Sequence, residues 1–265
     1  MPKRAFAVCA HPDDIEFTMA GTMILLGQVG YELHYMTIAN GSCGTTQFDR
    51  DTIVHMRGEE ARNAARSINA IYHESLTDDL DIYYERSTLV RLSSIMRQVA
   101  PEILLTHFPY DYMEDHANTC RLALTAAFAR GMPNYAVNPP HPPVDQPVTV
   151  YHSLPHGLLD PLGKTVNPDF YVDISSVIAQ KREMLAMHRS QKEWLDRSQG
   201  MDSYLQTMER NSNEVGKRTD RFQYAEGWTR HRYLGYCAPD ADPLTEALKE
   251  YIYIPGKNTE WYHSI

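Results

Sequence analysis

AFAVCAHPDDIE, residues 5–16, is the stretch that decides the fold and locates the chemistry of this chain. It begins with an apolar run, residues 5–10, which predicts a buried strand over 4–10. A histidine and two adjacent carboxylates follow directly, namely His11, Asp13 and Asp14. A strand that ends in these groups brings candidate metal ligands and a candidate base to one edge of a sheet. The stretch therefore indicates a site for hydrolytic chemistry.

Short apolar runs alternate with helical patterns through the first half of the chain. The expected strands are residues 4–10, 33–39, 70–73 and 102–107, and apolar residues at helical spacing mark 53–68 and 89–99. Parallel strands need crossover connections, and helices supply them. The pattern predicts an α/β fold with a Rossmann-like, mostly parallel sheet flanked by helices.

The proline-rich segment 133–147 cannot continue a helix and is the best internal boundary. We expect residues 1–132 to form the Rossmann-like core that carries the metal site, and residues 133–265 to complete the same domain. Strands at 148–154 and 170–174 and a helix at about 175–195 predict a C-terminal α+β elaboration. A chain of 265 residues can bury one substantial core.

The composition narrows the class of partner. A formal net charge of -9 argues against binding to nucleic acid or to an acidic membrane surface, and favours a small-molecule partner. Four scattered cysteines suggest neither a disulfide framework nor a metal knot. There is no signal-peptide pattern and no apolar stretch of roughly 18–20 residues, so we expect a cytoplasmic protein. The oligomeric state is left open, homo-oligomers included.

Three loops are expected to meet at one edge of the sheet, because ligands of such sheets bind at the carboxyl ends of strands. Residues 11–16 follow the first strand, 40–44 the second and 107–116 the fourth. The loop 40–44, NGSCG, has two interpretations: a phosphate cradle or part of the wall of the site. It lacks the spacing of the GxGxxG and P-loop motifs, which favours the second interpretation.

Asp115 and His116, within YDYMEDHAN at residues 110–118, form a second motif. Asp115 is placed to cap a helix that begins near Ala117, which would bring His116 to the same edge as His11. Two imidazoles and one carboxylate suit Zn²⁺ with one position left for water. Fe²⁺ and Co²⁺ accept the same ligand set.

These motifs resemble those of the PIG-L/LmbE-like family of zinc-dependent N-deacetylases, which are N-acetylglucosaminyl deacetylase-like proteins. Residues 10–16 and 115–116 carry the resemblance. Residues 56–60, MRGEE, are similar to the family's Arg-x-x-Glu helix, and 171–174 with 188–191 are similar to its C-terminal signature. The resemblance covers most of residues 4–195.

The resemblance implies removal of an N-acetyl or other N-acyl group from a small substrate, an amino sugar or its conjugate. It implies that His11, Asp14 and His116 hold zinc, and that Asp13 is the general base. Asp115 is counted with Asp13 as a catalytic residue. Zinc lowers the pKa of its water from about 15.7 towards 7, so that a nearby carboxylate can accept the proton.

Three further residues are candidate substrate-binding residues by the same resemblance. Arg57 would stabilise developing negative charge or position Asp13, and Asp79 would bind a substrate hydroxyl. His188 lies on or beside the apolar stripe of its helix, so a place in the core is the alternative to substrate binding.

The chain departs from the family at one position, where the usual His-Pro-Asp-His reads Met113-Glu114-Asp115-His116. The family's first histidine stabilises the oxyanion or protonates the leaving amine, whereas Met113 has only a weak acceptor sulfur. Loss of such a donor lowers a rate on the order of 10²- to 10³-fold. The candidates to replace it are His107, Tyr110, Tyr112, His188 or another C-terminal histidine.

Met113 leaves several functions open. The leading expectation is a de-N-acetylase. The others are a conjugate amidase acting on a non-sugar amide, a metal-containing binding protein without turnover, and a nucleotide-binding Rossmann-like protein.

Overall fold

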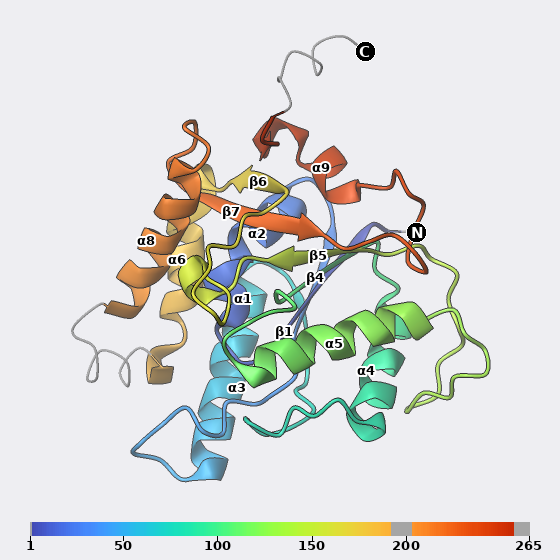
Figure 1. Ribbon diagram of the computed structural model, residues 1–265. Coiled ribbons are helices and arrows are strands. Elements are labelled where there is room, and N and C mark those ends of the chain that lie inside the picture. Colours follow the sequence, from blue (N-terminus) through green and yellow to red (C-terminus); the bar gives the residue numbers. More distant parts are fainter. Residues whose placement is uncertain (1, 192–202, 257–265) are drawn as a thin grey trace.

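The computed structural model describes residues 2–191 and 203–256, and an eight-stranded sheet runs through its centre (Figure 1). The strands are β1 (Arg4–Cys9), β2 (Glu32–Thr37), β3 (Ile71–His73), β4 (Ile103–Thr106), β5 (Thr149–Ser153), β6 (Phe170–Asp173), β7 (Ala225–Arg230) and β8 (Ile252–Tyr253). Their spatial order is β3-β2-β1-β4-β5-β7-β6-β8. The strands predicted from the sequence are confirmed, each to within a few residues.

The α-helices are α1 (Asp14–Thr18), α2 (Ala20–Gln28), α3 (Arg50–Ser67), α4 (Arg86–Val99), α5 (Glu114–Ala129), α6 (Ile178–Ala186), α8 (Ser203–Lys217) and α9 (Pro243–Ala247). Short 3-10 turns are η1 (His156–Leu158), η2 (Ser175–Val177) and η3 (Lys249–Tyr251). The expectation of one helix over 175–195 is wrong, because η2 precedes α6 and α6 ends at Ala186. Residues 192–195 lie outside the described residues.

The first five strands are parallel, and the remaining three make the sheet mixed. β1 pairs in parallel with β2 and β4, and β4 pairs in parallel with β5. β7 then runs antiparallel to β5 and to β6, and β8 antiparallel to β6. This confirms the predicted α/β fold with its mostly parallel sheet and C-terminal elaboration.

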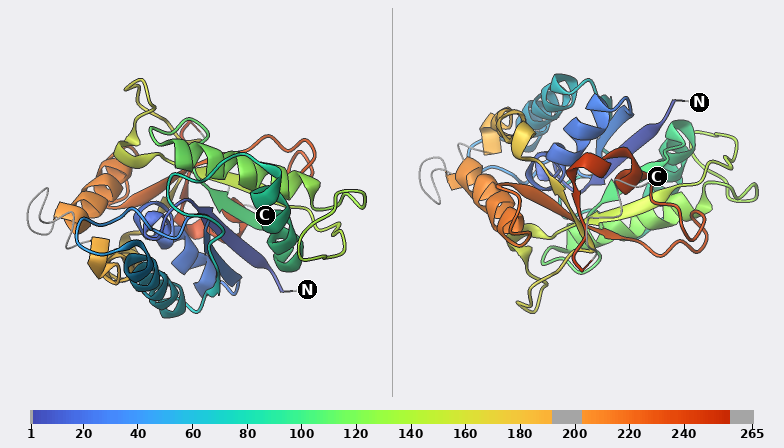
Figure 2. Two further views of the ribbon diagram at one scale, coloured as in Figure 1. Left: turned by 90° about the horizontal axis from the view of Figure 1, so that it is seen from below. Right: turned by 90° about the horizontal axis from the view of Figure 1, so that it is seen from above.

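Both faces of β1 are buried, because its side chains alternate between two cores. Ala5 and Ala7 pack into the core beneath α2, α3 and α6, whereas Phe6 and Val8 pack against α4 and α5. Figure 2 shows these helices on the two sides of the sheet. The two-sided burial explains why the strand reads as a continuous apolar run.

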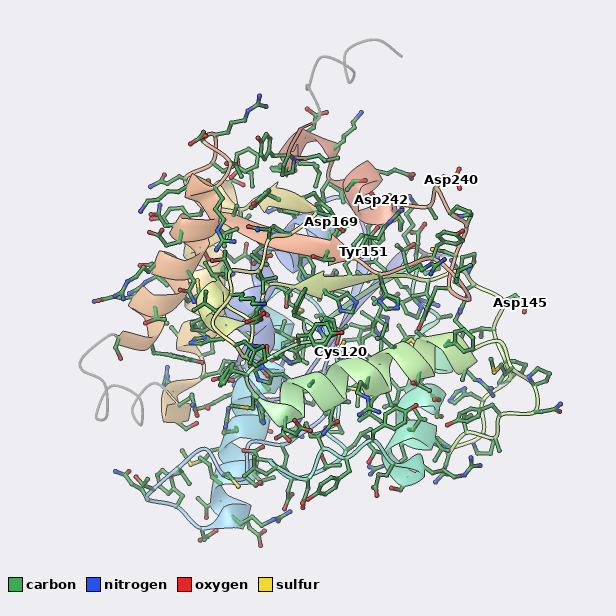
Figure 3. All side chains as sticks on the ribbon, viewed as in Figure 1. Cys120, Asp145, Tyr151, Asp169, Asp240 and Asp242 are labelled. Atoms are coloured by element: carbon green, nitrogen blue, oxygen red, sulfur yellow. The ribbon has the colours of Figure 1, made fainter. Side chains whose placement is uncertain are left out.

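The C-terminal portion is anchored to the sheet by buried polar contacts. The Tyr151 hydroxyl on β5 donates to Asp242 (2.6 Å) and accepts from the Leu244 amide, which holds the start of α9 (Figure 3). On β7, the buried Glu226 accepts from Thr22 and pairs with Lys181 Nζ at 2.7 Å. Pairing of this kind is what allows a charge to be buried.

The cysteines at positions 9, 43, 120 and 237 are free. No helix among the described residues is both long and apolar enough to cross a membrane.

Candidate active site

A cavity of about 410 Å³ opens at the carboxyl ends of the parallel strands. The loops after β1, β2 and β4 contribute to its wall, which confirms their predicted convergence. A fourth loop, after β5, joins them and was not predicted to do so. The residues that line the cavity from these four loops include His11, Asp13, Asp14, Cys43, Gly44, His107, Tyr112, Met113, His116, Leu154, Pro155 and His156.

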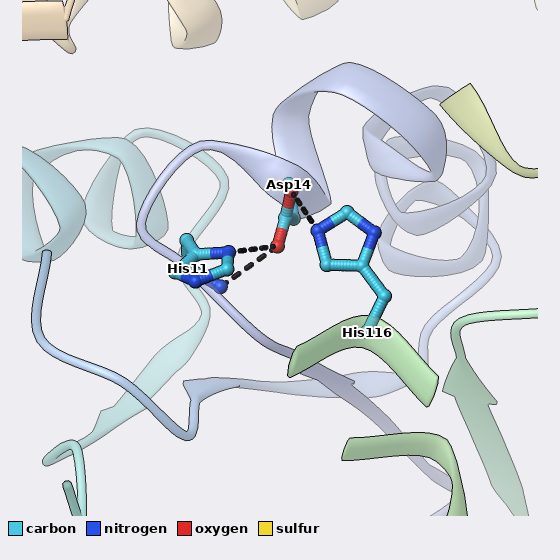
Figure 4. A group of neighbouring side chains, drawn as sticks. All are labelled: His11, Asp14 and His116. Carbon is cyan, nitrogen blue, oxygen red and sulfur yellow. Dashed lines mark hydrogen bonds and ion pairs between the residues drawn. The ribbon is translucent and has the colours of Figure 1, made fainter. Parts of the chain in front are cut away.

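His11, Asp14 and His116 face one another across a short gap (Figure 4). Asp14 Oδ2 lies 3.4 Å from His11 Nδ1, and Asp14 Oδ1 lies 3.4 Å from His116 Nε2. The His11 backbone amide donates to Asp14 Oδ2 at 2.7 Å, which fixes the carboxylate. One donor atom from each residue lies within 4.8 Å of the others, a set of three that suits a tetrahedral metal with one open position.

The outer nitrogen of each histidine meets its own carboxylate. His11 Nε2 lies 2.9 Å from Asp115 Oδ2, and His116 Nδ1 lies 3.0 Å from Asp111 Oδ1. Such partners fix the tautomer and orientation of a metal-binding imidazole. They leave His11 Nδ1 and His116 Nε2 facing Asp14.

Asp115 is therefore placed behind His11, with only 3% of its surface exposed. It also accepts a hydrogen bond from the Leu80 amide at 2.8 Å. The expectation that Asp115 caps the helix is wrong: α5 begins earlier, at Glu114, and its N-cap residue Met113 makes no side-chain cap bond. The carboxylate contacts His11 instead of the helix terminus.

The electrostatics of the three donors also fit a cation. Burial lowers the pKa of His11, but hydrogen bonds to Asp115 and Asp14 outweigh it and raise this pKa to about 9. Burial likewise lowers the pKa of His116, but Asp14 and Asp111 outweigh this effect and raise the pKa to about 10. Burial raises the pKa of Asp14, but His116, His107 and His11 hold it well below its ordinary value. A divalent ion would replace the two imidazolium protons.

Asp13 lies next to the donor set without belonging to it. Its φ of 110° is in the left-handed region, which is uncommon for a residue other than glycine and marks local strain. The Tyr204 hydroxyl donates to Asp13 Oδ2, and Arg57 Nη2 lies 3.4 Å from Oδ1. Burial raises the pKa of Asp13 despite the opposing effects of Arg57 and Tyr204. A carboxylate with a raised pKa is suited to accept a proton near neutral pH.

Tyr204 was missed from the sequence, because it lies in the polar stretch after residue 200. Tyr204 precedes Leu205 on α8 and is spaced from Met208 by one helical turn. This pattern predicts packing in the core and gives no sign of a role in the site. The contact with Asp13 joins residues 191 positions apart.

Arg57 is buried at the cavity wall, as a residue that positions other groups would be. Its guanidinium donates to the Pro12 carbonyl and reaches Asp13. Side chains at Gly41 and Gly44 would overlap this guanidinium, and Gly41 also has a φ of +82°. The two glycines therefore allow the loop after β2 to pack on Arg57.

Asp79 lines the cavity, but both carboxylate oxygens bind the loop at 40–44. Oδ1 accepts from the Gly41 amide at 2.7 Å and Oδ2 from the Cys43 amide at 2.9 Å. The Ser42 amide donates to Asn40 Oδ1. Because these amides are already hydrogen-bonded within the protein, the loop is not arranged to bind a phosphate. It forms part of the cavity wall, which is the interpretation that the sequence favoured.

His188 lies in the core, fully buried and outside the cavity wall. Its Nε2 is 3.3 Å from Glu16 Oε2, which also accepts from the Tyr35 hydroxyl. Contact between His188 and substrate is not supported by this position. The alternative, a place in the core, is the one that the structure supports.

Two other candidates to replace the missing histidine are placed less well, because His107 is already hydrogen-bonded and Tyr110 lies outside the cavity wall. His107 Nε2 accepts from the Ala10 amide at 2.9 Å, and its ring stacks on His116 with centroids 4.1 Å apart. Tyr110 is 71% exposed and does not line the cavity, whereas Tyr112 does.

Comparisons with known proteins agree with the motifs. Residues 6–127 match the family PIG-L, described as GlcNAc-PI de-N-acetylase. The chain is 26% identical over 201 residues to a diacetylchitobiose deacetylase of Thermococcus kodakarensis, covering 71% of this chain and 70% of the relative. It is 29% identical over 189 residues to a 4-oxalmesaconate hydratase of Pseudomonas putida, covering 68% and 70%.

The fold is shared with solved structures of the same two kinds. The N,N'-diacetylchitobiose deacetylase of Pyrococcus horikoshii matches with a TM-score of 0.74 at 22% identity, over 91% of this chain and 88% of that chain. The 4-carboxy-2-hydroxymuconate hydratase of Pseudomonas putida matches with a TM-score of 0.71 at 24% identity, over 86% and 95%. The segment that matches the family, residues 6–127, contains both motifs, at 10–16 and 115–116, so this part of the chain is similar to the PIG-L/LmbE-like family.

Proposed function

We propose that this protein is a metal-dependent hydrolase that removes an N-acetyl group from a small N-acetylated amino sugar or its conjugate. One observation carries the proposal. Asp13 lines the same cavity as the metal donors His11, Asp14 and His116, but it is not one of them. The deacetylases among the relatives support this choice of reaction.

A zinc ion held by the three donors would polarise the acetyl carbonyl and lower the pKa of a water towards about 7. Asp13 would accept a proton from the attacking water. Tyr204 and Arg57 hold the Asp13 carboxylate, and the raised pKa of Asp13 favours proton uptake.

The carboxylates behind the histidines act as positioning residues. Asp111 orients His116 and Asp115 orients His11. We therefore assign Asp115 a positioning role, in which it contacts His11 and not the substrate. Asp79 shapes the cavity by holding the loop after β2.

The test is acetate release from a panel of N-acetylated amino sugars and their conjugates, with non-sugar N-acyl amides alongside. Protein loaded with Zn²⁺, Fe²⁺ or Co²⁺ is compared with chelator-treated protein and with Asp14→Ala. We expect metal-dependent release from at least one amino sugar and none from Asp14→Ala. Binding of metal and sugar without release would instead indicate a binding protein, and release from non-sugar amides alone a conjugate amidase.

Hydration of a carbon–carbon double bond is a second candidate. It is supported by the 29% identity to a 4-oxalmesaconate hydratase. Addition of water also needs a base beside the attacking water, so the same residues would serve. Loss of absorbance from 4-oxalmesaconate, the conjugated unsaturated substrate in that relative's name, without acetate release from any sugar, would decide for hydration.

A further inference from the structure

We propose that His156 is a catalytic residue that donates a hydrogen bond to the carbonyl oxygen of the N-acetyl group, in place of the histidine that position 113 lacks. The inference rests on the proposed function and deepens it. It assigns a role to the loop after β5, which the sequence motifs do not include.

The topology of the sheet brings His156 to the site. β5 runs parallel to β4, so the residues after Ser153 leave the sheet at the same edge as the loop that leads from β4 to His116 on α5. His156 begins η1 two residues beyond the buried Leu154. It lines the same cavity as Asp13 and the three metal donors.

Aromatic neighbours in the cavity wall fix where the imidazole lies. Its ring centroid is 4.9 Å from that of Phe17 and 6.1 Å from that of Tyr112. The backbone after His156 turns through left-handed conformations at Gly157 (φ 74°) and Leu158 (φ 62°). Leu158 is not a glycine, so this turn is strained, as backbones at functional sites often are.

The ring nitrogens of His156 are free to contact a substrate. In the described part of the chain, neither nitrogen takes part in a hydrogen bond or an ion pair. Two other histidines considered for this role are placed differently: His107 Nε2 accepts from the Ala10 amide, and His188 lies fully buried in the core. Burial lowers the pKa of His156, so that its neutral imidazole has one N–H to donate.

The reaction balances with His156 acting only as a donor. The carbon–oxygen bond to water forms, the carbon–nitrogen bond breaks, and the proton accepted by Asp13 leaves on the amine. Negative charge develops on the carbonyl oxygen, where a positioned donor contributes on the order of 10²- to 10³-fold in rate.

The experiment compares His156→Ala, His156→Gln, and His156→Ala combined with Met113→His, on an amino sugar that the wild-type protein deacetylates. We expect His156→Ala to lower kcat by about 10²-fold or more with KM little changed. Glutamine keeps an N–H donor and should recover part of the rate. A histidine restored at Met113 should recover at least about tenfold over His156→Ala, a result that a purely structural role does not produce.

Zinc per chain and the melting temperature are measured on every variant, and His55→Ala, the same substitution at an exposed position of α3 outside the cavity wall, is the matched control. His55→Ala should stay within about threefold of wild type. A His156→Ala rate within threefold of wild type overturns the assignment while the proposed function stands. Loss of zinc together with activity also overturns it, because the residue would then be structural. Zinc-loaded wild type that deacetylates no sugar overturns the proposed function and this assignment with it.

Discussion

Binding of zinc should release about two protons at pH 7, because the metal-free site holds two imidazolium groups. The pKa values of about 9 for His11 and about 10 for His116 leave both rings almost fully protonated at this pH. Apparent zinc affinity should therefore rise about 100-fold per pH unit below pH 9, about tenfold between 9 and 10, and then level off.

The variant Asp115→Asn should change the number of protons released by an amount that can be calculated. Asp115 is the largest of the influences that raise the pKa of His11. If that pKa returns to its ordinary value of about 6.5, only about a quarter of His11 is protonated at pH 7, and the proton count falls by about 0.75. Calorimetric titration with zinc in two buffers of different ionisation enthalpy measures the count.

Asp79→Asn is the comparison variant, since it makes the same substitution in the cavity wall at a carboxylate whose hydrogen bonds, among the described residues, go to backbone amides. Asp79 raises the pKa of His11 less than Asp115 does, so Asp79→Asn should lower the proton count much less than Asp115→Asn. Equal counts for wild type and Asp115→Asn, or a wild-type count below one, would refute the reasoning.

Three other outcomes are expected. Metal-free protein should be most stable between about pH 4, the ordinary pKa of the paired carboxylates Asp14, Asp111 and Asp115, and pH 6.5. It should lose stability as pH rises through about 9 and 10, where His11 and His116 lose their protons, whereas zinc-loaded protein should change less; melting temperatures with and without chelator show this. Gly44→Ala should displace the Arg57 guanidinium and lower kcat by up to about 10²-fold with the fold intact by circular dichroism. Tyr204→Phe removes a donor to the proposed base, so its pKa should rise and the acid limb of the kcat/KM profile should move to higher pH; an unmoved limb would contradict the contact.

The parallel half of the fold could be predicted because its signals are local. Apolar runs alternate with helical spacing, and the carboxyl-end rule then brings residues 11–16 and 107–116 together. In the antiparallel half, only β6 was predicted as a strand, and neither its pairing nor the strands β7 and β8 could be predicted in this way. β7 reads AEGWTR, which has no clear alternation, and its place between β5 and β6 depends on pairing with strands far away in the chain.

The same distinction applies to the site. The three metal donors stand in two short motifs, whereas Tyr204 and His156 acquire their places through tertiary contacts. Asp115 shows a further difficulty, since an acid near a helix start is compatible both with a cap and with a partner for a histidine. Only the contact with His11 separates the two.

The central claim is that Asp13 acts on the reaction without holding the metal. Asparagine is the best replacement, because it tolerates the left-handed backbone at this position. Zinc per chain and acetate release from an N-acetylated amino sugar are measured on the same Asp13→Asn sample. We predict about one zinc per chain, as in wild type, and a turnover lower by about 10²- to 10⁴-fold. Wild-type turnover, or loss of the zinc, would contradict the claim.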